Sequence, residues 1–439
     1  MYARSVLPVS RVPSRITLGV SLILLACLVI LCLDVGSTWT KAALISDEGE
    51  LVRTGQHPTT PPEVLHGIDA LRESVGDGEL LACSSAGGGL RLAVVGQERV
   101  VSAEAGYRVA LSAGAKIVHV SAGPVDVKAL RATKPDLILL VGGTDGGDQS
   151  VLLHNAAKLA RVAVPIVLAG NIEAQPEALR LLAARTVVAC PNVLPDVGQL
   201  APEPARKAIR AAFLQHVIGG KGLSRGPRFR QLVRAVTPDA VLAGVSRLAA
   251  QDREGAVLVV DVGGATTDVY SAVSTADSEG LERTVALPPD RRTVEGDLGM
   301  RWSAPGVVKE AHAERLTTED LTHEAQLRAE NVGWLPDDPT VDVKLASFAA
   351  ILAVRRHLRQ VDGQLGPHGA GLLVLSGGVF RHTEDLTPVI EALRGDPVLR
   401  PILRTAEITV DRDYVLAPVG LLAESGRLEA ADRLAKRLT

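Results

Sequence analysis

The stretch Asp34-Val-Gly-Ser-Thr-Trp-Thr-Lys41 follows a short apolar run, Leu28–Leu33. An apolar run of this length indicates a buried β-strand, which here leads into a carboxylate and a glycine turn that carries hydroxyl groups. Glycine lets backbone N–H groups approach a phosphate closely, and the hydroxyls supply further donors. A carboxylate beside such a loop is suited to hold the Mg²⁺ that accompanies a nucleotide. The pattern therefore predicts a loop that binds a Mg²⁺-nucleotide.

A second stretch of the same kind, Asp261-Val-Gly-Gly-Ala-Thr-Thr-Asp268, follows the apolar run Val257–Val260. Two such motifs in opposite halves of the chain predict two lobes that close on one nucleotide from both sides. Asp34 and Asp261 are the candidate Mg²⁺ ligands, and with Asp268 they are the candidate catalytic carboxylates. The predicted phosphate donors of the two loops are Gly36, Ser37, Thr38, Gly263, Gly264, Ala265, Thr266 and Thr267.

Four other groups each allow two interpretations. Lys41 either neutralises phosphate charge or, in a continuing hairpin, points to solvent. Asp268 either orients the attacking water or the metal, or only stabilises its turn. Gly377 and Gly378 follow the predicted strand Leu372–Leu375 and either let the backbone lie against adenosine or form a plain strand-to-helix turn. Glu295 and Asp297 either face the cleft or cap the following helix.

The totals exclude several classes of protein. A chain of 439 residues with 46% apolar and 22% charged residues is globular and long enough for two or more domains. A net charge of −3 gives no general attraction to nucleic acid, and only four Phe, four Tyr and three Trp are present to stack on bases. The four cysteines form no C-x-x-C pair, which argues against structural zinc and disulfides and favours a reducing compartment.

The N-terminus resembles a signal anchor, because Arg4, Arg11 and Arg15 precede the apolar run Ile16–Leu33. The first strand must take the last part of that run, which leaves about 12 residues, too few to span a bilayer as a helix. We therefore expect a cytoplasmic protein, with membrane anchoring through residues 16–33 as the alternative.

From Leu28 onward, short apolar runs alternate with turn residues and amphipathic stretches, the pattern of an α/β protein. We expect an apolar extension over residues 1–27, a first lobe with an inserted α/β segment over 28–254, and a second lobe over 255–439. The charged stretch Lys309–Asn331 reads as one solvated helix. The loop Gly142-Gly-Thr-Asp-Gly-Gly147 matches neither the Walker-A nor the G-x-G-x-x-G pattern, so we assign it no role.

With these motifs the chain resembles the superfamily of actin, Hsp70-type chaperones and sugar kinases (ASKHA). Asp34–Lys41 and Asp261–Asp268 are similar to its two phosphate motifs, and Leu372–Gly378 is similar to its adenosine motif. The resemblance implies two ribonuclease-H-like, actin-like ATPase lobes around a nucleotide cleft. It also implies ATP and Mg²⁺ as cofactors, with the ion held through water by Asp34 and Asp261.

A narrower resemblance is to the glutamate mutase accessory (MutL/GlmL) family, which is unrelated to the mismatch-repair protein of similar name. It rests on Asp34–Ala42, Gly142–Gly147, Val294–Arg301 and Leu416–Gly420. Its members are thought to be ATP-dependent, chaperone-like reactivators of adenosylcobalamin-dependent mutases. This implies mutase subunits as partners, without identifying the mutase. No D-x-H-x-x-G cobalamin pattern is present, so the cobalamin would belong to the partner.

Three alternatives remain open: a small-molecule kinase of the same superfamily, an ATP-driven electron activator of dehydratases, and a nucleotide-responsive scaffold without hydrolysis. The electron activator would need cysteines for an iron–sulfur cluster, and no cysteine follows Cys190. No G-x-S-x-G elbow and no H-E-x-x-H spacing occur, so a serine hydrolase and a zinc enzyme of that type lack support.

Overall fold

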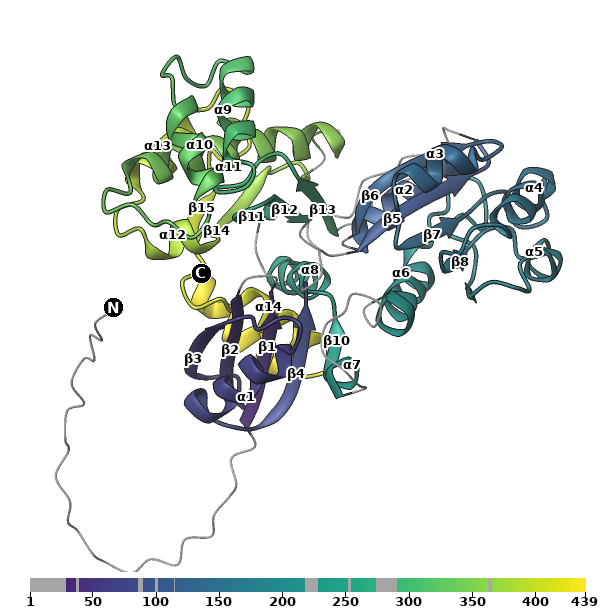
Figure 1. The fold of residues 1–439 in the computed structure, drawn as a ribbon, viewed down its shortest axis with the longest axis horizontal. Coiled ribbons are helices and arrows are strands. Elements are labelled where there is room, and N and C mark those ends of the chain that lie inside the picture. Colours follow the sequence, from purple (N-terminus) through teal and green to yellow (C-terminus); the bar gives the residue numbers. More distant parts are fainter. Residues whose placement is uncertain are drawn as a thin grey trace, which may run out of the picture.

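The fold consists of three five-stranded sheets with helices packed on their faces (Figure 1). The computed structural model describes residues 29–36, 39–85, 90–98, 102–113, 115–217, 228–251, 254–273, 290–361, 363 and 365–439. Ser37, Thr38 and the N-terminal residues 1–28 lie outside this range.

The first sheet has the strand order β10-β4-β1-β2-β3, and α1 (Val64–Val75) follows its outer hairpin. β1–β2 and β2–β3 are antiparallel, whereas β4 runs parallel to both β1 and β10. The strands are β1 (Val29–Val35), β2 (Trp39–Ser46), β3 (Leu51–Pro58), β4 (Glu79–Ser84) and β10 (Val233–Ala235).

The second sheet repeats this plan with the order β13-β12-β11-β14-β15 and the same strand directions. Its strands are β11 (Ala256–Val262), β12 (Thr267–Ala272), β13 (Asp290–Glu295), β14 (Ala370–Ser376) and β15 (Glu407–Val410). Three antiparallel strands followed by two parallel ones is the ribonuclease-H-like arrangement. The expected fold of two such lobes is confirmed.

Helices of the second lobe cover the sheet face that points away from the first lobe. They are α9 (Ala304–Ala313), α10 (Thr322–Glu330), α11 (Thr340–Gln360), α12 (Gly378–His382) and α13 (Thr387–Gly395). The single helix expected over Lys309–Asn331 is wrong, because α9 ends where Arg315 takes a left-handed φ of 57°. A new helix then begins after Asp320, whose carboxylate accepts from the Thr322 N–H.

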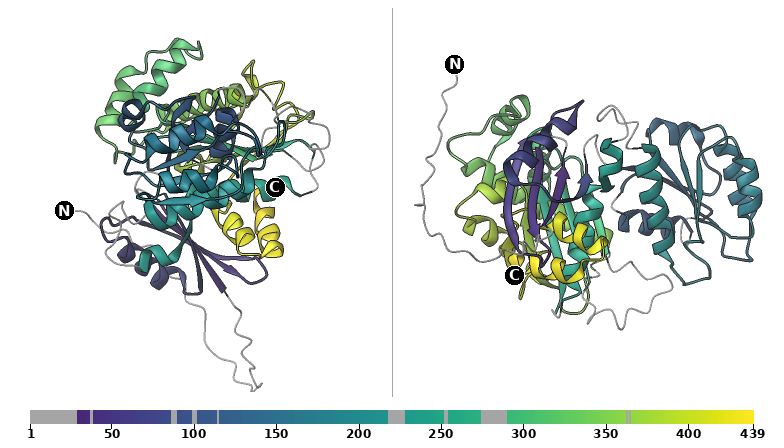
Figure 2. Two further views of the ribbon diagram at one scale, coloured as in Figure 1. Left: turned by 90° about the vertical axis from the view of Figure 1, so that its right-hand side faces the viewer. Right: turned by 90° about the horizontal axis from the view of Figure 1, so that it is seen from below.

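The third sheet is fully parallel, with the order β6-β5-β7-β8-β9, and lies in the sequence between β4 and β10. With its helices it projects to one side of the two lobes (Figures 1 and 2). Its strands are β5 (Arg91–Gly96), β6 (Lys116–Ala122), β7 (Leu137–Leu140), β8 (Ile166–Leu168) and β9 (Val187–Ala189). Its helices are α2 (Ser102–Ser112), α3 (Val127–Ala132), α4 (Ser150–Leu159), α5 (Gln175–Leu181) and α6 (Pro202–Ala212). The π-turn η1 (Phe213–Val217) and α7 (Arg228–Leu232) belong to the path back to the first sheet.

Successive side chains of the central strands pack into different hydrophobic cores. In β11, Val257 and Val259 join a core shared by both lobes, whereas Leu258 and Val260 face the helices of the second lobe. In β1, Ile30 and Cys32 enter the same shared core. Successive side chains of a strand point to opposite faces, so a near-continuous apolar run is what a strand buried on both faces requires.

Two helices connect the lobes and cross between them. α8 (Thr237–Ala249) leaves the first sheet and packs against the second, while α14 (Leu416–Glu424) leaves the second sheet and packs against the first. They touch through glycine, because a Cβ on Gly244 would lie 2.3 Å from the Leu416 carbonyl oxygen and one on Gly420 would lie 1.8 Å from that of Ala240. α15 (Leu428–Ala435) and the 3₁₀ turn η4 (Lys436–Leu438) end the chain beside this crossing.

Candidate functional site

Asp34 is held from three sides near the end of β1. The Thr237 hydroxyl, at the start of α8, donates to Asp34 Oδ1 over 2.5 Å, and Cys83 Sγ lies 3.7 Å from the same oxygen. Lys41 Nζ lies 3.7 Å from Oδ2. The carboxylate is therefore oriented by β4, by β2 and by the helix that connects the lobes. The Asp34 side chain is 14% exposed.

One of the two interpretations of Lys41, that it points to solvent, does not hold. Its ammonium lies 3.8 Å from the ring centroid of Tyr414, in the segment between β15 and α14. The Arg381 guanidinium of α12 also lies over this ring, 4.2 Å from the centroid. Burial opposes the charge on Lys41, but Asp34 and other nearby carboxylates outweigh that effect and raise its pKa. Lys41 thus connects the first lobe to a loop of the second.

Asp261 lies in β11 at the position that Asp34 has in β1, and its environment is strongly acidic. Burial raises the pKa of Asp261 to about 6, and the carboxylates of Asp268, Asp34 and Asp411 act in the same direction, whereas Lys41 opposes them. One ammonium thus serves several carboxylates, and the excess negative charge favours a bound cation.

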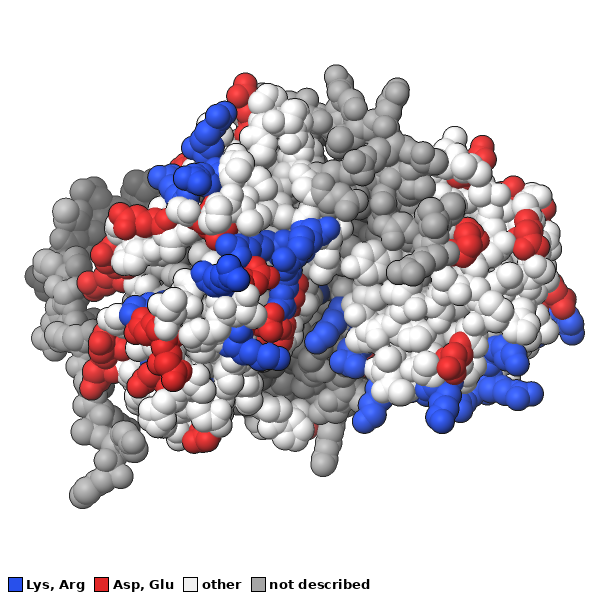
Figure 3. Space-filling view, turned by 90° about the horizontal axis from the view of Figure 1, so that it is seen from above, with Lys and Arg blue, Asp and Glu red and all other residues white. Residues whose placement is uncertain are grey.

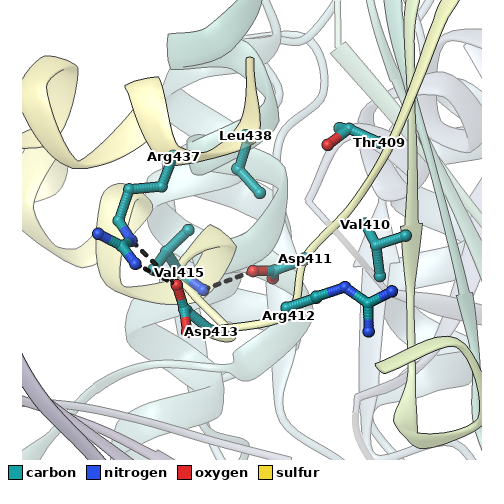
Figure 4. A pocket seen from close by; sticks show the side chains of 8 residues that line it. All are labelled: Thr409, Val410, Asp411, Arg412, Asp413, Val415, Arg437 and Leu438. Atoms are coloured by element: carbon teal, nitrogen blue, oxygen red, sulfur yellow. Dashed lines mark hydrogen bonds and ion pairs between the residues drawn. The ribbon is translucent and has the colours of Figure 1, made fainter. Parts of the chain in front are cut away.

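Asp411 is a site residue that the sequence analysis missed. It follows β15 and is 2% exposed, and its carboxylate accepts from the backbone N–H groups of Val415 (2.8 Å) and Leu416 (3.3 Å) at the start of α14. Burial raises the pKa of Asp411 to about 6 in spite of these donors. It lines an open pocket of about 410 Å³ between β15 and the C-terminal turn, where Arg437 pairs with Asp413 (Figure 4).

The second glycine loop has two backbone N–H groups without an acceptor among the described residues. The N–H groups of Met300 and Arg301 donate to the carbonyls of Gly263 and Gly264, and the Ser303 hydroxyl donates to that of Ala265. The carbonyls are thus turned toward Met300, Arg301 and Ser303, the first two of which belong to the string Val294–Arg301. In the part of the chain that the structure describes, no acceptor engages the N–H of Gly264 or Ala265. These two groups are available to a ligand.

Other predicted donors are already engaged. The N–H of Gly36 donates to the Trp39 carbonyl, and the N–H of Gly263 donates to that of Thr266, so each loop closes with the same bond. The Thr267 hydroxyl is buried and donates to the Leu298 carbonyl over 2.5 Å, so its proton is not available to a phosphate. The predicted donors Ser37 and Thr38 lie outside the described residues.

Asp268 is paired with a buried cation. Arg292 donates to Asp268 Oδ1 from Nε (2.9 Å) and Nη2 (2.5 Å), and the Thr266 hydroxyl donates to Oδ2 over 3.2 Å. These contacts favour turn stabilisation over orientation of a water molecule. Glu295 and Asp297 do not cap the following helix, α9, whose N-cap is Ser303. Arg356 of α11 binds both carboxylates, at 2.8 and 2.7 Å.

Gly377 and Gly378 differ in their surroundings. Gly377 has a φ of 113°, and a Cβ there would lie 2.3 Å from the Val262 carbonyl oxygen, so it must be glycine for the strand-to-helix turn to pack on β11. A Cβ on Gly378 would meet no described atom within 4 Å. Gly378 is therefore the one of the pair that leaves open space for a ligand.

The residues at this site suit Mg²⁺ that brings ligands of its own. Among the described residues, no three carboxylate, histidine or cysteine side chains converge closely enough to hold a metal by themselves. Asp34, Asp261 and Asp411 offer hard oxygen atoms, and Mg²⁺ commonly binds one or two carboxylates together with waters and phosphate oxygens. Direct coordination by a complete protein shell is thus not expected here.

The Gly142–Gly147 loop lies elsewhere, after β7 of the third sheet. Asn192 Nδ2 donates to the Gly143 carbonyl and to Asp145 Oδ1, at 2.9 Å each, and Asn171 Nδ2 donates to the Gly147 carbonyl over 3.1 Å. These contacts account for a rigid turn, and we assign it no function.

In the described residues no helix is both long and apolar enough to cross a membrane.

Comparisons with known proteins agree with the resemblance seen in the sequence. The family described as MutL protein matches residues 30–438. Protein MutL from Clostridium tetanomorphum is 33% identical to this chain over 446 residues, which cover 90% of this chain and 96% of that protein.

Several solved structures are similar over most of the chain but remain distant. The nucleotide-free structure of acetone carboxylase is 14% identical, with a TM-score of 0.38, over 90% of this chain and 70% of that one. A glucokinase of the ROK family from Streptomyces griseus, in complex with glucose and AMPPNP, is 14% identical with a TM-score of 0.34, over 93% and 99%. The activator of 2-hydroxyisocaproyl-CoA dehydratase from Clostridium difficile, with bound ADPNP, is 8% identical with a TM-score of 0.32, over 94% and 98%. At these scores we base no argument on them.

Proposed function

This chain belongs to the MutL protein family, and we propose that it is a Mg²⁺-dependent ATPase that reactivates an adenosylcobalamin-dependent amino-acid mutase. It would open the inactivated mutase, let damaged cobalamin leave and admit the intact cofactor. We expect it to act in the cytoplasm, where ATP is available. We also keep as a proposal the division into lobes over residues 28–254 and 255–439 after an extension over 1–27.

One observation carries the nucleotide part of this proposal. Asp34 and Asp261 lie near the ends of the central strands of two lobes with the same topology, and the charge of Lys41 acts on both carboxylates. Bound Mg²⁺ would neutralise the carboxylates and polarise the phosphates of ATP. Asp34 and Asp261 would hold the ion through water, while Gly264 and Ala265 would donate their N–H groups to phosphate.

The two helices that connect the lobes support the proposal that a bound nucleotide changes how the lobes are arranged. Thr237, which donates to Asp34, begins α8, and Asp411 accepts from the first N–H groups of α14. These two helices are the ones that cross at Gly244 and Gly420. A ligand shifts a conformational equilibrium only by binding one state better, and here the carboxylates that would sense it sit at the ends of the connecting helices.

The test is reactivation of the hydroxocobalamin-blocked amino-acid mutase of the same organism. Purified protein would be added with Mg²⁺-ATP and fresh adenosylcobalamin, and a parallel sample would lack ATP. We expect recovery only with ATP, and loss of recovery and of ATP hydrolysis in Asp261→Asn. Asp47→Asn, an exposed carboxylate in the turn after β2, is the matched control and should behave as wild type.

Other results would favour the alternatives. Phosphorylation of a small molecule would indicate a kinase, and equal binding of the mutase with ATP and a non-hydrolysable analogue, without phosphate release, would indicate a scaffold. The electron activator finds no support in the described cysteines. Cys32 and Cys83 are buried, and burial raises the pKa of Cys32 to about 12 and that of Cys190 to about 11.

A further inference from the structure

A pocket of about 490 Å³ on the part of the molecule built around the third sheet has an unusual set of charges. Its lining includes four cationic side chains from α3, from α4 and from the turn that follows α4, namely Lys128, Arg131, Lys158 and Arg161. Its other lining residues are Val125, Asp126 and Val127. Only one carboxylate therefore faces four positive charges.

Two short segments supply this cluster. Lys128 and Arg131 are three residues apart in α3, and residues at this spacing lie on the same side of a helix. Lys158 lies in the last turn of α4, and Arg161 lies in the turn that follows the end of this helix at Leu159. The two pairs converge because α3 and α4 lie next to each other in the lining of one pocket. The sequence shows each pair, but only the tertiary structure brings the pairs together.

The described part of the chain leaves most of this positive charge without a carboxylate partner. Asp126 uses its carboxylate as the N-cap of α3, accepting from the N–H groups of Lys128 (2.8 Å) and Ala129 (3.1 Å). The Arg131 guanidinium donates to the backbone carbonyl of Arg161. Among the described residues, the side chains of Lys128, Lys158 and Arg161 have no ion-pair partner. In a chain of net charge −3, this is a local excess of positive charge.

The location separates this pocket from the nucleotide site. α3 and α4 lie on the third-sheet part of the molecule, away from β1 and β11, where Asp34 and Asp261 are found (Figure 1). In the view of Figure 3, Lys and Arg side chains gather on this same part, at the lower right. A molecule bound there would leave the cleft between the lobes accessible to ATP.

The character of the pocket favours a protein surface over a small molecule. Small-molecule sites are mostly enclosed and apolar with a few fixed polar groups. Here the four cationic side chains are exposed, and the apolar lining is limited to two valines. Such an arrangement recognises charge more than shape, and charged rims of this kind attract a partner of opposite charge over a distance.

We propose that this pocket docks an acidic surface of the mutase, with Lys128, Arg131, Lys158 and Arg161 pairing with its carboxylates. The inference rests on the proposed function, since it names where the client binds. The third sheet then carries the client, while the two lobes bind ATP and move relative to it.

The test compares two variants of the full-length protein with equal charge change. One carries Lys128→Glu, Lys158→Glu and Arg161→Glu. The control carries Arg400→Glu, Arg404→Glu and Lys436→Glu, which are exposed side chains of the second lobe and the C-terminal turn that have no ion pair within the described structure. Binding to the mutase is measured by surface plasmon resonance at several NaCl concentrations, together with ATP hydrolysis.

We expect the association rate of the pocket variant with the mutase to be lower than that of wild type by about tenfold or more at low salt. This rate should also depend less on the NaCl concentration than the rate of wild type does. The control should bind as wild type, and both should hydrolyse ATP normally. Equal binding by the two variants would overturn the docking site while leaving the proposed function intact. Sodium tripolyphosphate that binds the pocket without competing with the mutase would also overturn it, in favour of a small-anion site. If wild type and control both fail to bind or reactivate the mutase, the proposed function fails as well.

Discussion

Lys41 and Asp268 occupy equivalent positions in the two lobes but carry opposite charges. Lys41 lies opposite Asp34 across the β1–β2 hairpin, and Asp268 lies opposite Asp261 across β11–β12. Each follows its partner by the same interval in the sequence. The first lobe therefore provides the cation of the site, whereas the carboxylate of the second lobe is taken by Arg292.

Replacing Lys41 with Met should weaken ATP binding by about tenfold or more, because a charge-assisted contact contributes about 1.5–3 kcal/mol. It should also raise the pKa of Asp261 further, since Lys41 opposes that shift. Calorimetric titration with Mg²⁺-ATP measures the affinity. Lys436→Met, an exposed lysine of the C-terminal turn, is the control. An unchanged affinity would show that Lys41 serves only to join the lobes through Tyr414.

Mg²⁺-ATP binding should weaken as the pH falls below about 6, because the ion must then displace a proton from Asp261. In the ligand-free protein, by contrast, a lower pH increases the contribution of Asp261 to the stability of the fold. A carboxyl whose folded pKa is raised stabilises the fold below its unfolded pKa of 3.8 and loses that contribution as the pH rises through 6.

Asp261→Asn should therefore stabilise the ligand-free protein at pH 7.5, by about 1 kcal/mol or more, and have little effect near pH 4. Urea denaturation of variant and wild type at both pH values measures this difference. A variant that is less stable than wild type at pH 7.5 would contradict the raised pKa of Asp261.

Gly420→Ala should destabilise the protein by about 1–3 kcal/mol and slow ATP hydrolysis, because the new methyl group forces α14 away from the Ala240 carbonyl of α8. The matched control is Gly395→Ala in α13, where a Cβ would meet nothing within 4 Å. Denaturation midpoints and turnover of both variants are compared. Equal behaviour of the two would mean that the helix crossing tolerates separation.

Asp268→Asn should cost about 3–5 kcal/mol of stability, because it leaves the buried guanidinium of Arg292 without its carboxylate. Combining it with Arg292→Met should recover part of that loss in a double-mutant cycle. If instead Asp268→Asn abolishes ATP hydrolysis at unchanged stability, Asp268 acts in catalysis and not only in stabilising its turn through Arg292.

Much of the nucleotide site follows from local patterns in the sequence. A hairpin is a local structure, so a strand, a glycine turn and a second strand bring Asp34 opposite Lys41 without help from the rest of the chain. The two-lobe fold follows in the same way from two copies of one pattern. Helix ends were less predictable, as α9 and α10 show, because Arg315 in a left-handed conformation has no clear signal in the sequence.

Local patterns could not show which distant groups complete the site. Thr237 reaches Asp34 from 203 residues away, and Tyr414 approaches Lys41 from the other lobe. Asp411 follows the short edge strand β15, which the sequence analysis did not predict, although an aspartate at a strand end is the same signal that identified Asp34. These contacts depend on how the sheets pair and how α8 and α14 cross, which no local pattern contains.

The amino-acid order alone was thus sufficient for β1 and β11, their glycine turns and the carboxylates Asp34 and Asp261, since these depend on neighbours within a few residues. Tertiary structure alone decided that Asp268 is neutralised by Arg292, that Lys41 stacks on Tyr414, and that four cations line one pocket. The physical reason is that charge pairing and burial act between side chains close in space, and their energies depend on surroundings assembled from distant parts of the chain.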